Sequence, residues 1–205
     1  ARDSSALPLL EFTLDELFMR QAEDKILTFA AYRELGGIEG ALARRAEEVY
    51  GSLAPAVQAT LPAVLRALVA PGHGSKYSLV SRRVPVDSLA VTEENKALLD
   101  AFTGARLLVT DRAGDSRAVV GVAHEALLRH WPRARQWLDE DREFLQTRER
   151  VAGAAYHWRQ EGRLSDLLLA RGKPLSEALD MVARWRGDLT AEVIEYVEAS
   201  ARKET

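Results

Sequence analysis

Side chains that commonly perform chemistry in proteins are sparse in this sequence. It contains no cysteine, which excludes disulfides, thiolate metal sites and cysteine nucleophiles. Its four histidines form no metal-binding pattern, because even the nearest two, His124 and His130, are six residues apart and would lie on different sides of a helix. No serine stands in a nucleophile-elbow motif. We find no catalytic constellation, so the sequence predicts that this chain alone is not an enzyme.

A phosphate-binding loop is also missing from the sequence. Such a loop needs the pattern G-x-x-x-x-G-K-[ST], in which backbone amides and a lysine hold the phosphates and a hydroxyl holds magnesium. The only Gly-Lys pair is Gly172-Lys173, and Pro174 follows where the hydroxyl should be. We therefore expect no nucleotide hydrolysis and very weak ATP or ADP binding by this chain alone.

The composition is that of an ordinary globular protein that needs no membrane. The chain has 205 residues, of which 47% are hydrophobic and 29% charged. The 28 Lys and Arg residues nearly balance the 31 Asp and Glu residues, which argues against binding nucleic acid or anionic membranes through bulk charge. No apolar run approaches the roughly 20 residues of a membrane span, and we expect a cytoplasmic protein. Because the first methionine is Met19, we expect a part of a longer protein.

The first quarter of the chain predicts a helical subdomain at residues 1–53. Apolar residues recur at helical spacing in 9–18, after Pro8, which suits the first turn of a helix. Gly36 and Gly37 predict the end of a second helix, and the apolar face of 38–53 predicts a third. This pattern indicates packing and no chemistry.

The next segment, residues 54–131, predicts a winged helix-turn-helix. Pro62 must open a new helix or kink the existing one. A helix at 92–104 begins with Thr92 as its cap. The segments with strand-like composition are 77–85, 106–111 and 118–124. Helices followed by a small β-hairpin are typical of this fold.

The remaining residues, 132–205, predict a helical extension, so that the whole chain is mostly α. Pro132 can begin a helix, and we expect that helix to continue to Gly162. Three further helices are expected at 164–172, 174–187 and 190–205. The four tryptophans, all in or beside this region, are expected to be packing residues.

A winged helix suggests DNA binding as one alternative. The outer face of the helix at 92–104 carries Glu93, Glu94 and Asp100 against the single Lys96. Because that face would repel a phosphate backbone, nucleic acid is not the expected partner. A helical protein-interaction scaffold is the other alternative.

The segment VVGVAHEALLRHWPRARQWLDEDREFL, residues 119–145, resembles the end of the winged-helix domain of STAND-type signal-transduction ATPases. These are the bacterial relatives of the NB-ARC and NACHT switches. His124 and Glu125 stand where the family has its MHD motif. The segment ALPLLEFTLDELF at 6–18 resembles the element that opens the helical domain after the ATPase core, although Ala6 replaces the family's glycine. The resemblance covers about residues 5–160.

The resemblance implies that this fragment is the lid and lever of a nucleotide switch. In the family, the histidine at the position of His124 contacts the β-phosphate of ADP and holds the closed state, so His124 is the implied nucleotide sensor. Glu125 would form a restraining ion pair, and Pro8 would pack on the adenine. The implied partners are the P-loop ATPase core of the same polypeptide and a downstream domain of WD-type repeats. ADP or ATP with Mg²⁺ would belong to that parent protein, and the fragment itself would hold no cofactor.

The residues themselves leave two roles open for the histidine. An imidazole where a strand ends and a helix begins can donate an N–H to a phosphate, or it can cap or pack against the helix. For Pro8, an ordinary first-turn position is equally compatible with the sequence. Arg82, Arg83 and Arg106 could contact a nucleotide or a neighbouring domain, but exposure on the surface is the simpler expectation.

Overall fold

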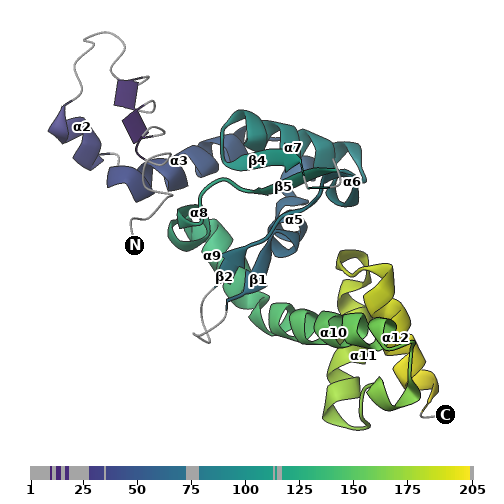
Figure 1. The fold of residues 1–205 in the computed structure, drawn as a ribbon. Helices are drawn as coiled ribbons and strands as arrows, with labels where there is room; N and C mark the ends of the chain where they lie inside the picture. The colour runs from purple at the N-terminus through teal and green to yellow at the C-terminus, as the bar shows by residue number, and fades with distance from the viewer. Residues whose placement is uncertain are drawn as a thin grey trace. The chain divides into compact units, whose positions relative to one another are not determined.

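The structure of the chain is a computed structural model (Figure 1). It describes residues 10, 13–14, 17–18, 28–34, 36–72, 79–112, 114 and 117–203. Most of these residues are helical, and the described strands form one sheet of two strands and one of three. The predicted mostly α class is therefore confirmed.

The chain divides into two compact units. The first consists of Ala1–Val69 and Leu79–Asp139, and the second of Ala70–Ser78 and Glu140–Thr205. The three subdomains that we expect at 1–53, 54–131 and 132–205 remain a prediction.

The first unit begins with helices α2 (Phe29–Glu34) and α3 (Gly37–Ser52). Gly36 and Gly37 have φ angles of 76° and 70°, which favour glycine and end α2 where the sequence predicts. On α3, small and apolar side chains at helical spacing are buried, namely Ala41, Leu42 and Ala46. Of the first expected helix, Leu10, Thr13, Leu14, Leu17 and Phe18 are helical, and Pro8 lies outside the described residues.

Two short helices, α4 (Pro55–Gln58) and α5 (Leu61–Ala67), follow in this unit. Pro62 lies in the first turn of α5, where its missing N–H has no intrahelical partner to lose. It therefore opens a new helix, which is one of the two outcomes the sequence allows. Strands β1 (Val69–Pro71) and β2 (Leu79–Ser81) form the two-stranded sheet.

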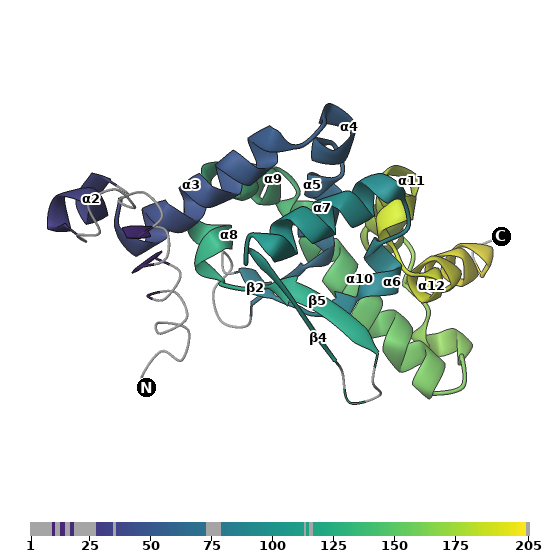
Figure 2. The ribbon, with the colours of Figure 1, turned by 90° about the horizontal axis from the view of Figure 1, so that it is seen from above.

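The three-stranded sheet is built around a β-hairpin (Figure 2). The elements of this part of the chain are, in order, β3 (Val84–Pro85), α6 (Val86–Leu89), α7 (Glu93–Gly104), β4 (Leu108–Arg112) and β5 (Ala118–Val122). The strand order is β3-β5-β4, with both pairs antiparallel. The side-chain oxygen of Thr92 accepts a hydrogen bond from the Asn95 amide at 3.2 Å, so the predicted cap of α7 is confirmed. This order of elements is consistent with a winged helix.

The unit ends with α8 (Ala126–His130) and α9 (Pro132–Glu140). Trp131, between them, is 1% exposed and packs edge-on against Tyr50 of α3. The expected break at Pro132 is confirmed. Helix α3 packs against α8, which joins the first helices of the chain to the segment that follows the hairpin.

The expected single helix from Pro132 to Gly162 is wrong. Helix α9 ends at Glu140, and α10 (Arg142–Gln160) begins after Asp141, which has φ −92° and ψ 11°. The acidic residues at this break are Asp139, Glu140 and Asp141. Negative charge is unfavourable at the C-terminus of one helix and favourable at the N-terminus of the next, which supports an end at this point.

The second unit packs three helices, α10, α11 (Lys173–Trp185) and α12 (Ala191–Arg202), against one another. Two short 3₁₀ helices, η1 (Ser165–Leu167) and η2 (Arg186–Asp188), connect them. The interior contains Trp158 and Tyr196, whose rings are 5.5 Å apart.

The helix that we expect at 164–172 is also wrong, because only η1 forms there. Hydroxyl groups of α12 bind this segment instead. The Tyr196 hydroxyl donates to the carbonyl of Leu167 at 2.8 Å, and the Ser200 hydroxyl oxygen accepts from the amide of Leu169 at 3.1 Å. These tertiary hydrogen bonds replace those that a continued helix would make.

Candidate functional site

His124 lies at the corner where β5 leads into α8. The chain on either side of it is fixed by backbone hydrogen bonds. The amide of Ala123 donates to the carbonyl of Leu107 at 3.0 Å, and the His124 carbonyl accepts from the amide of Leu127 at 2.9 Å. His124 is 9% exposed, so its ring is largely covered but retains some accessible surface.

Burial decides the charge of this imidazole. It lowers the pKa of His124 from the ordinary value of 6.5, because the charged form loses hydration. The ring is therefore neutral near pH 7, with one N–H donor and one acceptor nitrogen. Such a group can donate one hydrogen bond to an oxygen anion in a site that excludes water, without the cost of burying a positive charge.

Glu125 is exposed and bound on both sides. One carboxylate oxygen accepts from the Ser81 amide at 3.3 Å, and the other lies 3.4 Å from the Arg129 guanidinium, one turn along. The pair with Arg129 is local and exposed, so it contributes little stability. Helix α8 has only five residues, which leaves a small dipole to assist anion binding at its N-terminus.

The predicted site residues are not all brought together by the structure. His124 and Glu125 are adjacent in sequence and lie at the same corner, whereas Pro8 is outside the described residues. Sequence reasoning named Arg82, Arg83 and Arg106 as possible nucleotide contacts but did not place their two segments beside this corner. Ser81 and Leu107 are far from His124 along the chain. Leu107 reaches the corner through the pairing of β4 with β5, and Ser81 through its hydrogen bond to Glu125.

The described residues contain no cluster of three or more His, Cys, Asp or Glu side chains that could hold a metal ion. Nor does any helix in the described ranges have the length and apolar character to cross a membrane.

Comparison with protein-family models gives a match over residues 1–166, to the family Novel STAND NTPase 1. The match covers most of the chain and includes the His124 corner. The chain belongs to this novel STAND family. No curated protein and no solved structure matches it.

The outer face of α7 in this STAND family member carries mostly negative charge. Glu93, Glu94 and Asp100 are exposed, and Lys96 forms an ion pair with Glu93 at 2.7 Å. Hydrogen bonds at the helix start, first from its own backbone amide and then from Thr92, lower the pKa of Glu94 below 4.5. This face therefore offers no free cation to a phosphate backbone.

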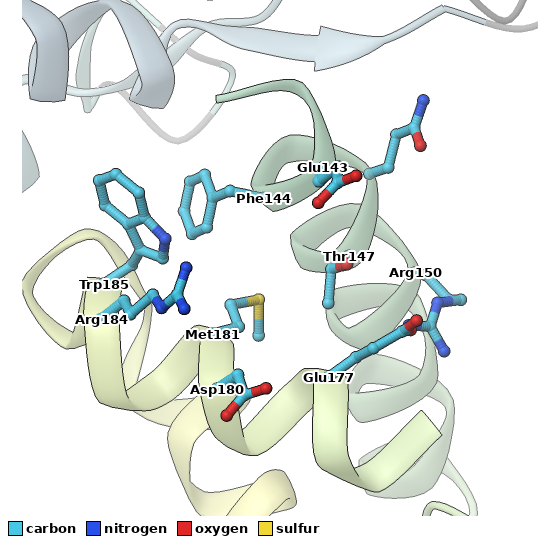
Figure 3. Close-up of a pocket in the computed structure, with 10 residues that line it drawn as sticks. Glu143, Phe144, Thr147, Arg150, Glu177, Asp180, Met181, Arg184 and Trp185 are labelled. Atoms are coloured by element: carbon cyan, nitrogen blue, oxygen red, sulfur yellow. The ribbon is translucent and has the colours of Figure 1, made fainter. Parts of the chain in front are cut away.

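A groove of about 670 Å³ lies between α10 and α11 in the second unit (Figure 3). Its α10 side falls within the STAND family match, and its α11 side lies beyond it. At one end, the rings of Phe144 and Trp185 face each other with centroids 4.9 Å apart. At the other end, Arg150 and Glu177 form an ion pair at 2.6 Å. The lining brings together no combination of side chains that performs known chemistry.

Proposed function

We propose that this chain is the regulatory part of a nucleotide switch, in which His124 senses ADP held by another part of the same polypeptide. The observation that supports this most is the match to a STAND NTPase family over residues 1–166, which includes a histidine at the corner between β5 and α8. The chain would act in the cytoplasm, where it would close over the bound nucleotide and transmit opening to the next domain.

The chemistry of the corner suits a phosphate oxygen. In the closed state, the neutral imidazole of His124 would donate an N–H to the phosphate from a largely covered position, where a hydrogen bond to an anion is stronger than in water. Glu125, the anion nearest in sequence, is engaged by Ser81 and Arg129. Its charge is thus partly offset where a phosphate would approach.

Because this chain has no phosphate-binding loop, we expect another part of the same polypeptide to bind the phosphates of the nucleotide. The sequence has no G-x-x-x-x-G-K-[ST] pattern, so a P-loop core elsewhere in the polypeptide would hold the phosphates and Mg²⁺. This chain would close over that core while His124 contacts the diphosphate. On opening, α8 and α9 would transmit the change to a downstream domain, which we expect to consist of WD-type repeats.

The proposal is tested by the ADP that stays bound to the full-length protein after purification. Replacement of His124 by alanine should lower the ADP content per protein molecule and raise basal output, because the closed state loses a hydrogen bond. His157→Ala is a matched control, since His157 is an exposed residue of α10. Unchanged ADP content in the His124 variant would refute the sensor and favour an interaction scaffold.

A further inference from the structure

Two arginines border the end of the three-stranded sheet at which His124 lies. On one side, Leu108 pairs with Val122, and the hydrogen bond from Ala123 to Leu107 continues this register. Arg106 immediately precedes Leu107. Because β4 and β5 are antiparallel, the start of β4 and the end of β5 lie at the same end of the sheet (Figure 2).

On the other side, the segment between β2 and β3 lies beside β5. Val84 pairs with Val120, and the Ser81 amide donates to Glu125. Arg82 immediately follows Ser81. Arg82 is therefore adjacent to Ser81, which is hydrogen-bonded to Glu125, and Arg106 is adjacent to Leu107, which is hydrogen-bonded to Ala123. Ala123 and Glu125 are the two neighbours of His124 along the chain.

The Arg82 side chain has no structural partner in the described part of the chain. It is partly buried, and neither an ion pair nor a side-chain hydrogen bond engages its guanidinium there. Its neighbour differs, because Arg83 crosses over Gly121 and forms an ion pair with Asp111 of β4 at 2.6 Å. Arg83 thus serves the sheet, while no side chain among the described residues neutralises the charge of Arg82.

Arg106 occupies a backbone position that glycine normally takes. Its φ is 58°, and it follows the end of α7 in a Schellman motif. The hydrogen bonds of that motif run from Leu107 to the carbonyl of Phe102 and from Arg106 to that of Thr103, both at 2.9 Å. A non-glycine residue is strained in this conformation, and strained residues cluster at functional sites.

We infer that Arg82 and Arg106 bind the phosphate groups that His124 contacts, an inference that rests on the proposed function. A diphosphate carries several negative charges, and a neutral imidazole offsets none of them. Guanidinium groups form charge-assisted, bidentate hydrogen bonds with phosphate oxygens. With Arg82 and Arg106 in the segments on either side, two permanent cations would join the neutral donor, beside the Glu125 carboxylate that Ser81 and Arg129 engage.

The test compares the affinities of the full-length protein, freed of nucleotide, for ADP and for adenosine, measured by calorimetry. Arg82→Ala and Arg106→Gly should each weaken ADP binding by about 10- to 100-fold, the loss of one charged hydrogen bond, and leave adenosine binding unchanged. The matched control is Arg83→Ala, which removes the same charge from the adjacent position and should change ADP affinity less than about twofold. Thermal melting of each variant checks that the fold is retained.

A comparison with His124→Ala separates the two claims. If His124→Ala weakens ADP binding while both arginine variants behave like Arg83→Ala, the inference is wrong and the proposed sensor stands. If none of these variants changes ADP affinity, the sensor is refuted together with the inference. Equal losses for ADP and adenosine in the arginine variants would also overturn it, because the contact would then not be with phosphate.

Discussion

The carboxylate of Glu47, on α3, accepts a hydrogen bond at 2.8 Å from the indole Nε1 of Trp131, which follows α8. The same carboxylate binds the guanidinium of Arg133, whose Nε lies 3.1 Å from Oε2. Arg133 in turn lies over the ring of Tyr50, at 4.4 Å from its centroid. This cluster connects α3 to the segment that follows His124 and α8.

Glu47 is held in its charged form by this cluster. The hydrogen bond from Arg133 is the largest cause that lowers the pKa of Glu47 below 4.5, and the hydrogen bond from Trp131 adds to it, while burial opposes both. Trp131 is 1% exposed, and the Glu47 carboxylate is the acceptor that satisfies its indole N–H.

Replacement of Glu47 by alanine should therefore destabilise the fold by about 1–3 kcal/mol, because a buried indole N–H is left without an acceptor. Urea unfolding of the chain, followed by circular dichroism, measures this difference. Glu47→Gln retains a carbonyl oxygen for Trp131 and should lose less. An exposed glutamate of α10 supplies the control, and Glu149→Ala should change stability by less than about 0.5 kcal/mol. Equal stability of the Glu47→Ala and Glu149→Ala variants would contradict this account of the cluster.

The lowered pKa of His124 predicts a specific pH dependence of stability. The unfolded chain takes up a proton at this histidine near pH 6.5, whereas the folded chain does so only at lower pH. The folded state therefore loses stability relative to the unfolded state as pH falls below 6.5, by less than about 1.4 kcal/mol per pH unit. Thermal melting of the wild type and of His124→Gln between pH 7.5 and 5.5 should show this loss in the wild type alone. Parallel curves would mean that His124 titrates normally.

Arg106→Gly is predicted to preserve or raise stability, because glycine relieves the strain of a positive φ by about 1 kcal/mol. Arg163→Gly is the instructive comparison. Arg163 also has a positive φ, 64°, and its side chain pairs with Glu195 at 2.9 Å and lies over Trp158. Its replacement removes these contacts together with the strain, which should reduce or reverse the gain. Urea midpoints of each variant against the wild type measure these changes, and a clear destabilisation by Arg106→Gly would show that the contacts of its side chain outweigh the strain.

The DNA-binding alternative has its own test. The negative face of α7 predicts no mobility shift of duplex DNA by the chain at 50 mM salt, because phosphate contacts require cations. Lys96, the cation on that face, is paired with Glu93. A shift that weakens steeply as salt is raised would show that another surface binds DNA.

Local chemistry in the sequence predicted many of the element boundaries. Thr92 caps α7 and the Gly36-Gly37 pair ends α2 as predicted, and Pro62 opens α5, which is one of the two outcomes the sequence allowed. All three depend on backbone preferences of the residues themselves. The expected helix at 164–172 was wrong because contacts with a distant part of the chain outweigh local preferences. Residues 164–172 have helical spacing, yet hydroxyls of Tyr196 and Ser200 hold them in another conformation.

In the candidate site, too, the features that depend on local sequence could be predicted and the long-range contacts could not. The place of His124 at the end of a strand followed from its apolar flanks, and the structure puts it there. Neither the bond from Ser81 to Glu125 nor that from Trp131 to Glu47 could be predicted, since they join residues 44 and 84 positions apart. Contacts of this range depend on strand register and helix packing, which composition and spacing do not specify.

The most direct test of the nucleotide sensor is the rate at which ADP dissociates from the full-length protein. His124→Ala should accelerate dissociation by about tenfold, because the diphosphate loses one hydrogen bond in a site that excludes water. His157→Ala, at an exposed position, should leave the rate unchanged. A stopped-flow chase of fluorescent ADP with excess unlabelled ADP measures both variants. Equal rates for wild type and His124→Ala would contradict the central claim that this histidine holds the nucleotide.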